Sequence, residues 1–454
     1  MRKFGVVVVL LLVVALVAFV VAGSRPGPSI QIAKPEKLVG ASTPVEIVVG
    51  TPAADPSAVT IVFEQNGTRT TIPHLDPKTV GVRDTGAAAG QTAVVGVVSR
   101  ETVPMLASGA GRIIVSATRP VLFGLRTVAS EVMRGVQVRL EKPRLEVVST
   151  HHYINVGGSE AIVYKVQPND VASGVTVGDF EYPGFPATGA AGEGVAIQDP
   201  SLRIAFFALR YDQPESTPMR LYARDEAGNT TSAEFEHRVF PKAFKSSRIA
   251  IEDKFLEKVI PAILATTTEI NPQGSLIDKF VAVNSELRKK NADTIAAQAA
   301  KTSAAMLWKG VVFHPFTNNA VESAFADKRT YVYNGKDVDH QTHLGFDLAS
   351  TANATIVAAN RGKVVYAAPL GIYGNCVIID HGMGVQSLYG HLSSLAVQAG
   401  ADVEKEQPIG KSGQTGMAGG DHLHFTMLVN GQMVNPVEWW DSHWIADRIL
   451  RKLK

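Results

Sequence analysis

The sequence His343-Leu344-Gly345-Phe346-Asp347 lies in the C-terminal quarter of the chain, and two further histidine segments follow it, Gly390-His391-Leu392 and His422-Leu423-His424. All three segments have the character of β-strands, where residues two or four apart point to the same face. His343 and Asp347 can therefore converge on one point, and His422 and His424 can do likewise. Two imidazoles and one carboxylate leave one position of a tetrahedral Zn²⁺ ion open for water, which is the pattern of a catalytic zinc site. The spacing alone allows more than one choice of ligands among the histidines.

Residues from about Trp308 to Trp440 resemble the lysostaphin-type (LytM-like) zinc metallopeptidases, which cut peptidoglycan cross-links. Several separated motifs in the family's order carry the resemblance, which implies a β-rich zinc peptidase domain over residues 307–454. One departure is Ala326, which stands where the family's Phe-Gly-x-Arg segment has glycine. Besides the histidine segments, the connecting motifs are Gly374–Gly382, Gly410–Gly416 and Val434–Pro436.

The resemblance also implies a role for each histidine of the three segments. His343, Asp347 and His424 are expected to bind Zn²⁺. His391 and His422 are then the unligated histidines that orient or deprotonate the attacking water and hydrogen-bond the tetrahedral intermediate. Histidine suits both tasks because its unperturbed pKa is about 6.5.

Tyr389 is a candidate substrate-binding residue because it stands two positions before His391. On a regular strand the two side chains share one face, so the phenol can act as an oxyanion donor. The alternative is a packed aromatic side chain without a part in the reaction.

A non-catalytic regulator that activates another cell-wall hydrolase is the alternative function for such a domain. A regulator that has lost its metal is expected to lack at least one ligand or one facing histidine. This sequence retains the complete set, namely His343, Asp347, His391, His422 and His424. The sequence therefore favours a zinc metalloendopeptidase that hydrolyses peptide bonds in peptidoglycan stem peptides or cross-links.

The N-terminus predicts a membrane anchor. An apolar run from Phe4 to Ala22 follows Arg2 and Lys3, and its length is close to the ~20 residues that span a bilayer. It exceeds the apolar core of a typical signal peptide, and the two basic residues place the N-terminus in the cytoplasm. We therefore expect a signal anchor over residues 1–23, with the rest of the chain exported to the periplasmic side of the inner membrane. Cleavage at Val21–Ser24 is the alternative, and it would give a secreted protein.

Composition argues against a polybasic nucleic-acid-binding protein and against a disulfide-stabilised fold. The 454 residues carry a formal net charge of +2, which gives no polybasic case for binding nucleic acid. Cys376 is the single cysteine, so the fold does not depend on intramolecular disulfides.

The region between the anchor and the peptidase domain predicts two β domains and a helical segment. Short β-type runs and an Asn66-Gly67 turn signal indicate a β-sandwich-like domain over 36–142. A second block, 143–241, contains Ala223–Asn229, which resembles the end of bacterial immunoglobulin-like repeats. Residues 242–306 have the apolar period of helices and predict a helical connector. The expected fold is thus mostly β and multidomain, with peptidoglycan and the membrane as partners and the β domains available to protein partners.

Overall fold

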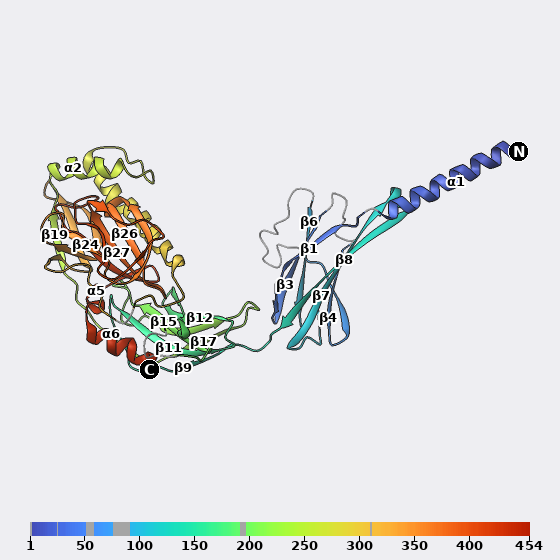
Figure 1. The fold of residues 1–454 in the computed structure, drawn as a ribbon, viewed down its shortest axis with the longest axis horizontal. Coiled ribbons are helices and arrows are strands. Elements are labelled where there is room, and N and C mark those ends of the chain that lie inside the picture. The colour runs from blue at the N-terminus through green and yellow to red at the C-terminus, as the bar shows by residue number, and fades with distance from the viewer. Residues whose placement is uncertain (1, 25, 51–58, 76–90, 191–196, 309–310) are drawn as a thin grey trace. The chain divides into compact units, whose positions relative to one another are not determined.

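A computed structural model describes residues 2–24, 26–50, 59–75, 91–190, 197–308 and 311–454. It is mostly β and divides into two compact units (Figure 1). The first unit comprises residues 1–143 and 224–230, and the second comprises 144–223 and 231–454. The sequence divides 36–454 into four domains, and the three boundaries between them stay predictions.

The first unit begins with α1 (Arg2–Gly23), whose Val6–Gly23 stretch is long and apolar enough to cross a membrane. A three-stranded sheet and a five-stranded sheet follow and share one apolar core. Asn66 and Gly67 have positive φ values of 52° and 79° and join two neighbouring strands, as the turn signal predicts. The first sheet runs β1 (Ser29–Lys34), β3 (Ser42–Gly50), β6 (Gln91–Ser99), and the second β2 (Leu38–Val39), β8 (Arg126–Val138), β7 (Gly109–Val121), β4 (Val59–Gln65), β5 (Thr68–Ile72).

The second unit begins with a β-rich region made of two four-stranded sheets and one parallel strand pair. The sheets run β14 (Phe185–Pro186), β15 (Leu202–Ala208), β11 (Ser159–Gln167), β9 (Arg144–Val147) and β13 (Phe180–Pro183), β12 (Ala172–Val177), β16 (Met219–Arg224), β17 (Thr230–Glu234), and the pair is β10 (His152–Asn155) with β18 (His237–Phe240).

The helical segment packs on the peptidase region and also contributes a strand to it. β19 (Ser246–Ala250) pairs in parallel with β21 (Asp327–Tyr333), which pairs with β22 (Lys336–His343). Apolar side chains of the helices share a core with Cys376 and Leu388 of the main sheet. The helical elements are α2 (Asp253–Leu264), α3 (Leu276–Ala282), the π-helical turn η5 (Val283–Leu287) and α4 (Arg288–Ala297).

The main sheet of the peptidase region places the three histidine segments next to one another. The strands that carry Asp347, His424 and His391 are direct neighbours in it. In order across the sheet, the strands are β20 (Ala320–Ser323), β23 (Phe346–Ala349), β31 (Leu423–Val429), β27 (Val385–Leu392), β26 (Asn375–Asp380), β25 (Gly362–Pro369) and β29 (Asp402–Val403), with β32 (Gln432–Val434) beside β31. A smaller sheet is formed by β24 (Thr355–Val357), β30 (Pro408–Lys411) and β28 (Ser394–Leu395).

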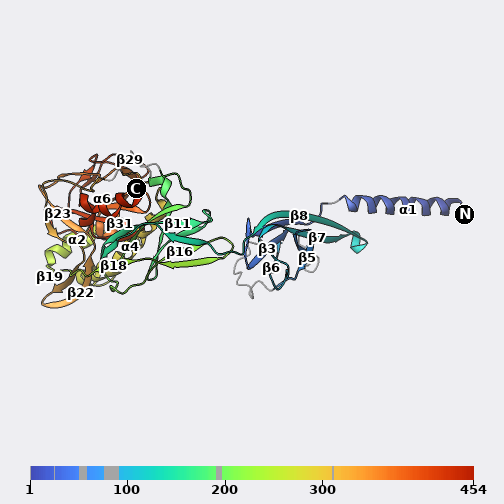
Figure 2. The same cartoon turned by 90° about the horizontal axis from the view of Figure 1, so that it is seen from below.

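The C-terminal helices α5 (Pro436–Trp439) and α6 (Ser442–Arg448) join the peptidase region to the β-rich region that precedes it. The indole Nε1 of Trp439 donates to Ser159 Oγ over 3.0 Å, and Glu438 Oε2 accepts from the Ser159 amide over 2.8 Å. Lys452 Nζ lies 2.9 Å from Glu160 Oε1. In both views α6 lies beside β11 (Figures 1 and 2). A single apolar core therefore runs from Ile154 to Leu453 through both regions.

Candidate metal centre

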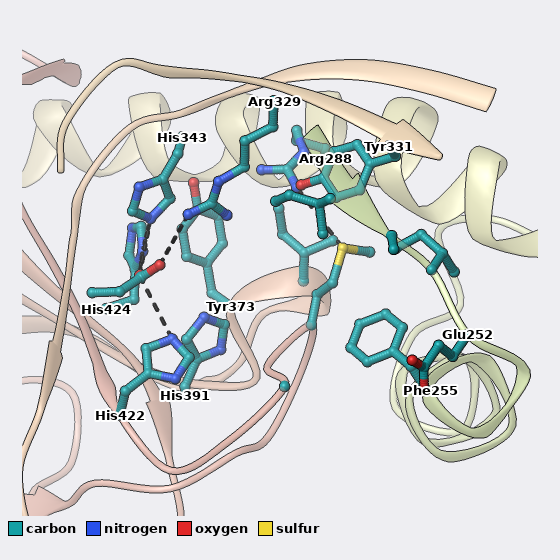
Figure 3. A pocket seen from close by; sticks show the side chains of 17 residues that line it. Glu252, Phe255, Arg288, Arg329, Tyr331, His343, Tyr373, His391, His422 and His424 are labelled. Carbon is teal, nitrogen blue, oxygen red and sulfur yellow. Dashed lines mark hydrogen bonds and ion pairs between the residues drawn. The ribbon is translucent and has the colours of Figure 1, made fainter. Parts of the chain in front are cut away.

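Three side chains converge at the centre of the sheet because of strand register. Asp347 on β23 lies directly opposite His424 on β31, and His343 ends β22 four residues before Asp347. His343 Nε2 is 2.9 Å from Asp347 Oδ1 and 3.0 Å from His424 Nδ1, and His424 Nδ1 is 3.1 Å from Asp347 Oδ1. All three side chains are buried (Figure 3).

This triangle of atoms fits a zinc ion. Zn–N and Zn–O bonds of about 2.0–2.2 Å separate tetrahedral ligand atoms by roughly 3.3 Å, close to the observed separations. The donor set of two imidazoles and one carboxylate is one that zinc takes in catalytic sites. The triangle therefore has the composition and size of three of the four positions around one Zn²⁺.

Neighbouring groups hold the ligand atoms in the orientation that metal binding requires. His343 Nδ1 donates to the Ala324 carbonyl over 3.2 Å, which leaves the lone pair of Nε2 directed at the triangle. Arg329 Nη2 donates to Asp347 Oδ2 over 3.1 Å, so Oδ1 remains for the metal. The Nε2 atom of His424 is buried without a hydrogen-bond partner among the described residues.

The close approach of the His424 ring explains why position 345 of the first motif is a glycine. A Cβ built at this position would lie 2.5 Å from Cε1 and Nε2 of His424 and 2.9 Å from the Phe425 carbonyl. The absence of a side chain therefore lets the ring of His424 pack against the backbone that joins His343 to Asp347.

Electrostatics favour the protonation states that bind metal. Burial opposes ionisation of Asp347, but His343, His422 and His424 hold the pKa of its carboxyl well below the usual value. Burial lowers the pKa of His424 to about 4, so the ring is neutral near pH 7. A carboxylate and a neutral imidazole are the forms in which these side chains bind metals.

His391 and His422 face the triangle from the same side of the cavity (Figure 3). Their ring centroids are 4.8 Å apart, and His422 Nε2 lies 3.6 Å from Asp347 Oδ1. His391 Nδ1 donates to the Thr415 carbonyl over 2.8 Å, and His422 Nδ1 donates to the Gly420 carbonyl over 3.0 Å. These bonds leave Nε2 of each ring available on the cavity side.

The pKa values of these two rings are shifted in opposite directions. Burial, followed by the nearby rings of His422 and His424, holds the pKa of His391 well below its usual value. Burial also acts to lower the pKa of His422, but the hydrogen bond and charge of Asp347 outweigh it and raise the pKa.

Tyr389 does not take the place expected from strand alternation. It is fully buried, and its hydroxyl accepts from the Ala359 amide over 2.7 Å and from Ser387 Oγ over 2.9 Å, away from the cavity. The alternation stops because His391 has a φ of +63°, so residues two apart do not share a face there. The substrate-binding role expected for Tyr389 therefore has no support in its position, and the packed alternative describes it.

Tyr373 lines the cavity instead. It ends the short helical turn η7 (Gly371–Tyr373), and its ring lies edge-on to His424 with centroids 5.3 Å apart. Its position immediately before the Gly374–Gly382 motif is the sequence signal that points to it.

His343, Asp347 and His424 line one cavity of about 420 Å³ together with the two facing histidines. Its opposite wall includes Glu252, Phe255 and Arg288 from the segment that precedes the peptidase region and Tyr331 from β21. Glu252 and Phe255 lie at the far end (Figure 3). The remaining lining residues are Ile249, Ala250, Ile251, Arg329, Ile372, Tyr373, Met417 and Gly419.

Comparison with known proteins agrees with this geometry. Peptidase family M23 matches residues 341–436. The DD-carboxypeptidase/endopeptidase Mpg of Neisseria meningitidis serogroup B is 41% identical over 95 residues, which are 21% of this chain and 22% of the relative. The murein hydrolase activator EnvC of Escherichia coli is 36% identical over 95 residues, 21% of this chain and 23% of the relative. The matched segment thus spans less than a quarter of either relative.

Among solved structures, the catalytic domain of lysostaphin from Staphylococcus simulans is 28% identical, with 26% of this chain and 90% of that chain covered and a TM-score of 0.23. The family match contains the ligand triangle and both facing histidines within residues 341–436. This chain therefore carries a LytM-type peptidase M23 domain at its C-terminus.

Proposed function

We propose that this protein is a zinc-dependent endopeptidase that hydrolyses peptide bonds in peptidoglycan stem peptides or cross-links. The observation that supports it most directly is the triangle of His343 Nε2, Asp347 Oδ1 and His424 Nδ1, with sides of 2.9, 3.0 and 3.1 Å, at the base of a cavity that two further histidines face.

His343, Asp347 and His424 would hold the zinc ion, and Arg329 would keep the carboxylate of Asp347 in place through its second oxygen. When bound, Zn²⁺ supplies Lewis acidity that polarises a peptide carbonyl and acidifies water. Both facing histidines have Nε2 directed at the cavity. A neutral ring there accepts a proton from the attacking water, and a protonated ring donates a hydrogen bond to the developing oxyanion.

The alternative function is a non-catalytic activator of another cell-wall hydrolase. The likeness to EnvC, which is named a murein hydrolase activator, is the observation that favours it. Against it stands the complete set of ligands and facing histidines. Binding of a partner hydrolase to this protein without zinc-dependent cleavage would support the alternative.

The place of action we propose is the cell envelope. α1 would anchor the protein in the inner membrane, with the β domains and the peptidase domain on the exported side. The β domains would then carry the peptidase domain towards the wall or bind protein partners there.

The test uses the full-length protein in detergent with purified sacculi, and mass spectrometry of the released products. We expect zinc-dependent release of peptide fragments that a chelator abolishes and added Zn²⁺ restores. His391→Ala is expected to retain bound zinc but to lose about 10²–10⁴-fold in rate. Zinc-loaded, folded protein that releases nothing from sacculi would overturn the proposed activity.

A further inference from the structure

The wall of the cavity opposite the ligand triangle contains a positioned cation, Arg288. This residue is the first of α4 and directly follows the π-helical turn η5, outside the segment that matches the M23 family. π-Helical turns occur frequently at functional sites. In Figure 3 the Arg288 side chain lies between Arg329 and Tyr331, on the side of the cavity away from His422.

Two hydrogen bonds to one residue fix the orientation of Arg288. Its Nε donates to the Asn284 carbonyl over 3.0 Å, and its Nη2 donates to Asn284 Oδ1 over 2.5 Å. Asn284 is fully buried, and its Nδ2 donates to Asp339 Oδ2 over 2.7 Å. Asp339 therefore acts on Arg288 only through a neutral amide, and the guanidinium is held in place without being paired.

Arg329, the other arginine of the cavity wall, is held differently. It is bonded to Asp347 at 3.1 Å and lies 3.6 Å from Asp327, so two carboxylates balance its charge. Arg288 has only neutral partners, namely Asn284 and, at 3.9 Å, Met417 Sδ. No carboxylate of the described residues forms an ion pair with it, so its guanidinium has no direct counter-charge in a cavity that we assign to substrate.

We propose that Arg288 binds a free carboxylate of the substrate, carried by a residue close to the scissile peptide bond, and thereby determines specificity. This inference rests on the proposed function and names the chemical class of its substrate. A guanidinium presents a planar set of donors that matches a carboxylate, and the Nη1 edge is free of protein partners in the described structure. The limited volume of about 420 Å³, shared with the metal ligands, keeps this carboxylate near the reacting carbonyl.

The test compares two synthetic cross-linked stem peptides that differ in one group. The residue beside the scissile amide carries a free carboxylate in one peptide and a carboxamide in the other. We expect the full-length, zinc-loaded protein in detergent to hydrolyse the acid with a kcat/KM about tenfold or more above that of the amide. Arg288→Gln should remove this preference, mainly through a higher KM for the acid.

Lys289→Gln is the matched control, because it makes the same change of charge at the next residue of α4, where the side chain is exposed. It should retain the preference for the acid. Arg288→Lys, which keeps the charge but loses the planar donors, should give an intermediate preference and covers the case in which Arg288→Gln does not fold.

The outcomes separate this inference from the proposed function. Equal hydrolysis of acid and amide by the unaltered protein would overturn the role of Arg288 and leave the peptidase intact. If the unaltered, zinc-loaded protein hydrolyses neither peptide and releases nothing from sacculi, the proposed peptidase activity is contradicted. Isothermal titration of the zinc-loaded His391→Ala variant with each peptide measures the preference with little turnover, and equal affinities would again overturn the role of Arg288.

Discussion

Arg329 and Asp347 are joined by one hydrogen bond of 3.1 Å, from Nη2 to Oδ2, and this bond assigns the two oxygens of the carboxylate to different partners. Oδ2 belongs to the arginine, and Oδ1 remains directed at His343 and His424. The guanidinium thus orients the carboxylate and leaves Oδ1 free for the metal that we propose.

Arg329→Met is expected to weaken zinc binding by about 10–100-fold, because the carboxylate loses the partner that orients it. Competition with a chromogenic chelator measures the affinity. Arg248→Met is the control, since Arg248 is an exposed arginine of β19 paired with Asp337 and should leave zinc affinity unchanged. Equal affinity in both variants would contradict the role given to Arg329.

Gly345→Ala should disturb the ligand triangle, because its Cβ would lie 2.5 Å from the His424 ring. A displacement of about 1 Å at a reacting centre costs about 100-fold in rate, so we expect a loss of that order on sacculi together with a lower zinc content. Gly135→Ala serves for comparison: a Cβ there meets nothing within 4 Å, and its φ is not in the positive range. If Gly345→Ala retains full activity, the close packing against His424 is unimportant.

Ala326→Gly is expected to stabilise the protein. Ala326 is fully buried, has a φ of +62°, and its amide donates to the His343 carbonyl over 2.7 Å. A left-handed conformation costs an L-residue about 1–2 kcal/mol, which glycine avoids at a smaller cost in chain entropy. We expect a gain of about 0.5–1 kcal/mol in the free energy of unfolding, followed as a higher Tm in calorimetry.

Ala358→Gly is the control for Ala326→Gly, and we expect it to change stability in the opposite direction. Ala358 is also fully buried but does not have a positive φ, so glycine should destabilise the protein there. A lower Tm for both variants would show that the conformation of Ala326 stores no strain.

Glu438 should make stability depend on pH. Burial raises its pKa from a usual value of 4.5 to about 7. Below pH 4.5 the carboxyl is protonated in both the folded and unfolded states. Between pH 4.5 and 7 the unfolded state loses the proton first, so the contribution of this group to stability falls by about 3 kcal/mol over that interval and stays constant above it.

Glu438→Gln cannot titrate, so its Tm should vary less than that of the unaltered protein between pH 4.5 and 7. The quantity to compare is the slope of Tm against pH, not the absolute Tm. The glutamine amide also alters the hydrogen bonds to Asn155 and Ser159, which changes Tm at every pH. Identical pH profiles for the two proteins would show that Glu438 is ionised throughout the range.

Strand periodicity, a local property of the chain, paired His343 with Asp347 and His422 with His424. The resemblance to the LytM-like family predicted that these side chains and His391 form one site. The sequence misplaced Tyr389, because the φ of +63° at His391 ends the alternation and nothing in the residue type announces that conformation. The sequence did not predict that Arg288 lines the cavity. That contact depends on how helices of one segment pack on strands more than fifty residues later, which periodicity does not encode.

The apolar core that runs through Tyr164, Phe206, Trp439 and Ile449 has a practical consequence for anyone wishing to isolate the catalytic portion. A fragment cut at Leu307 would leave the indole of Trp439 and the carboxylate of Glu438 without Ser159, and would strip β21 of the parallel neighbour β19. An expression boundary near Arg144 retains every one of these partners, so the smallest stable fragment that contains the M23 domain is expected to be more than twice as long as residues 307–454 alone.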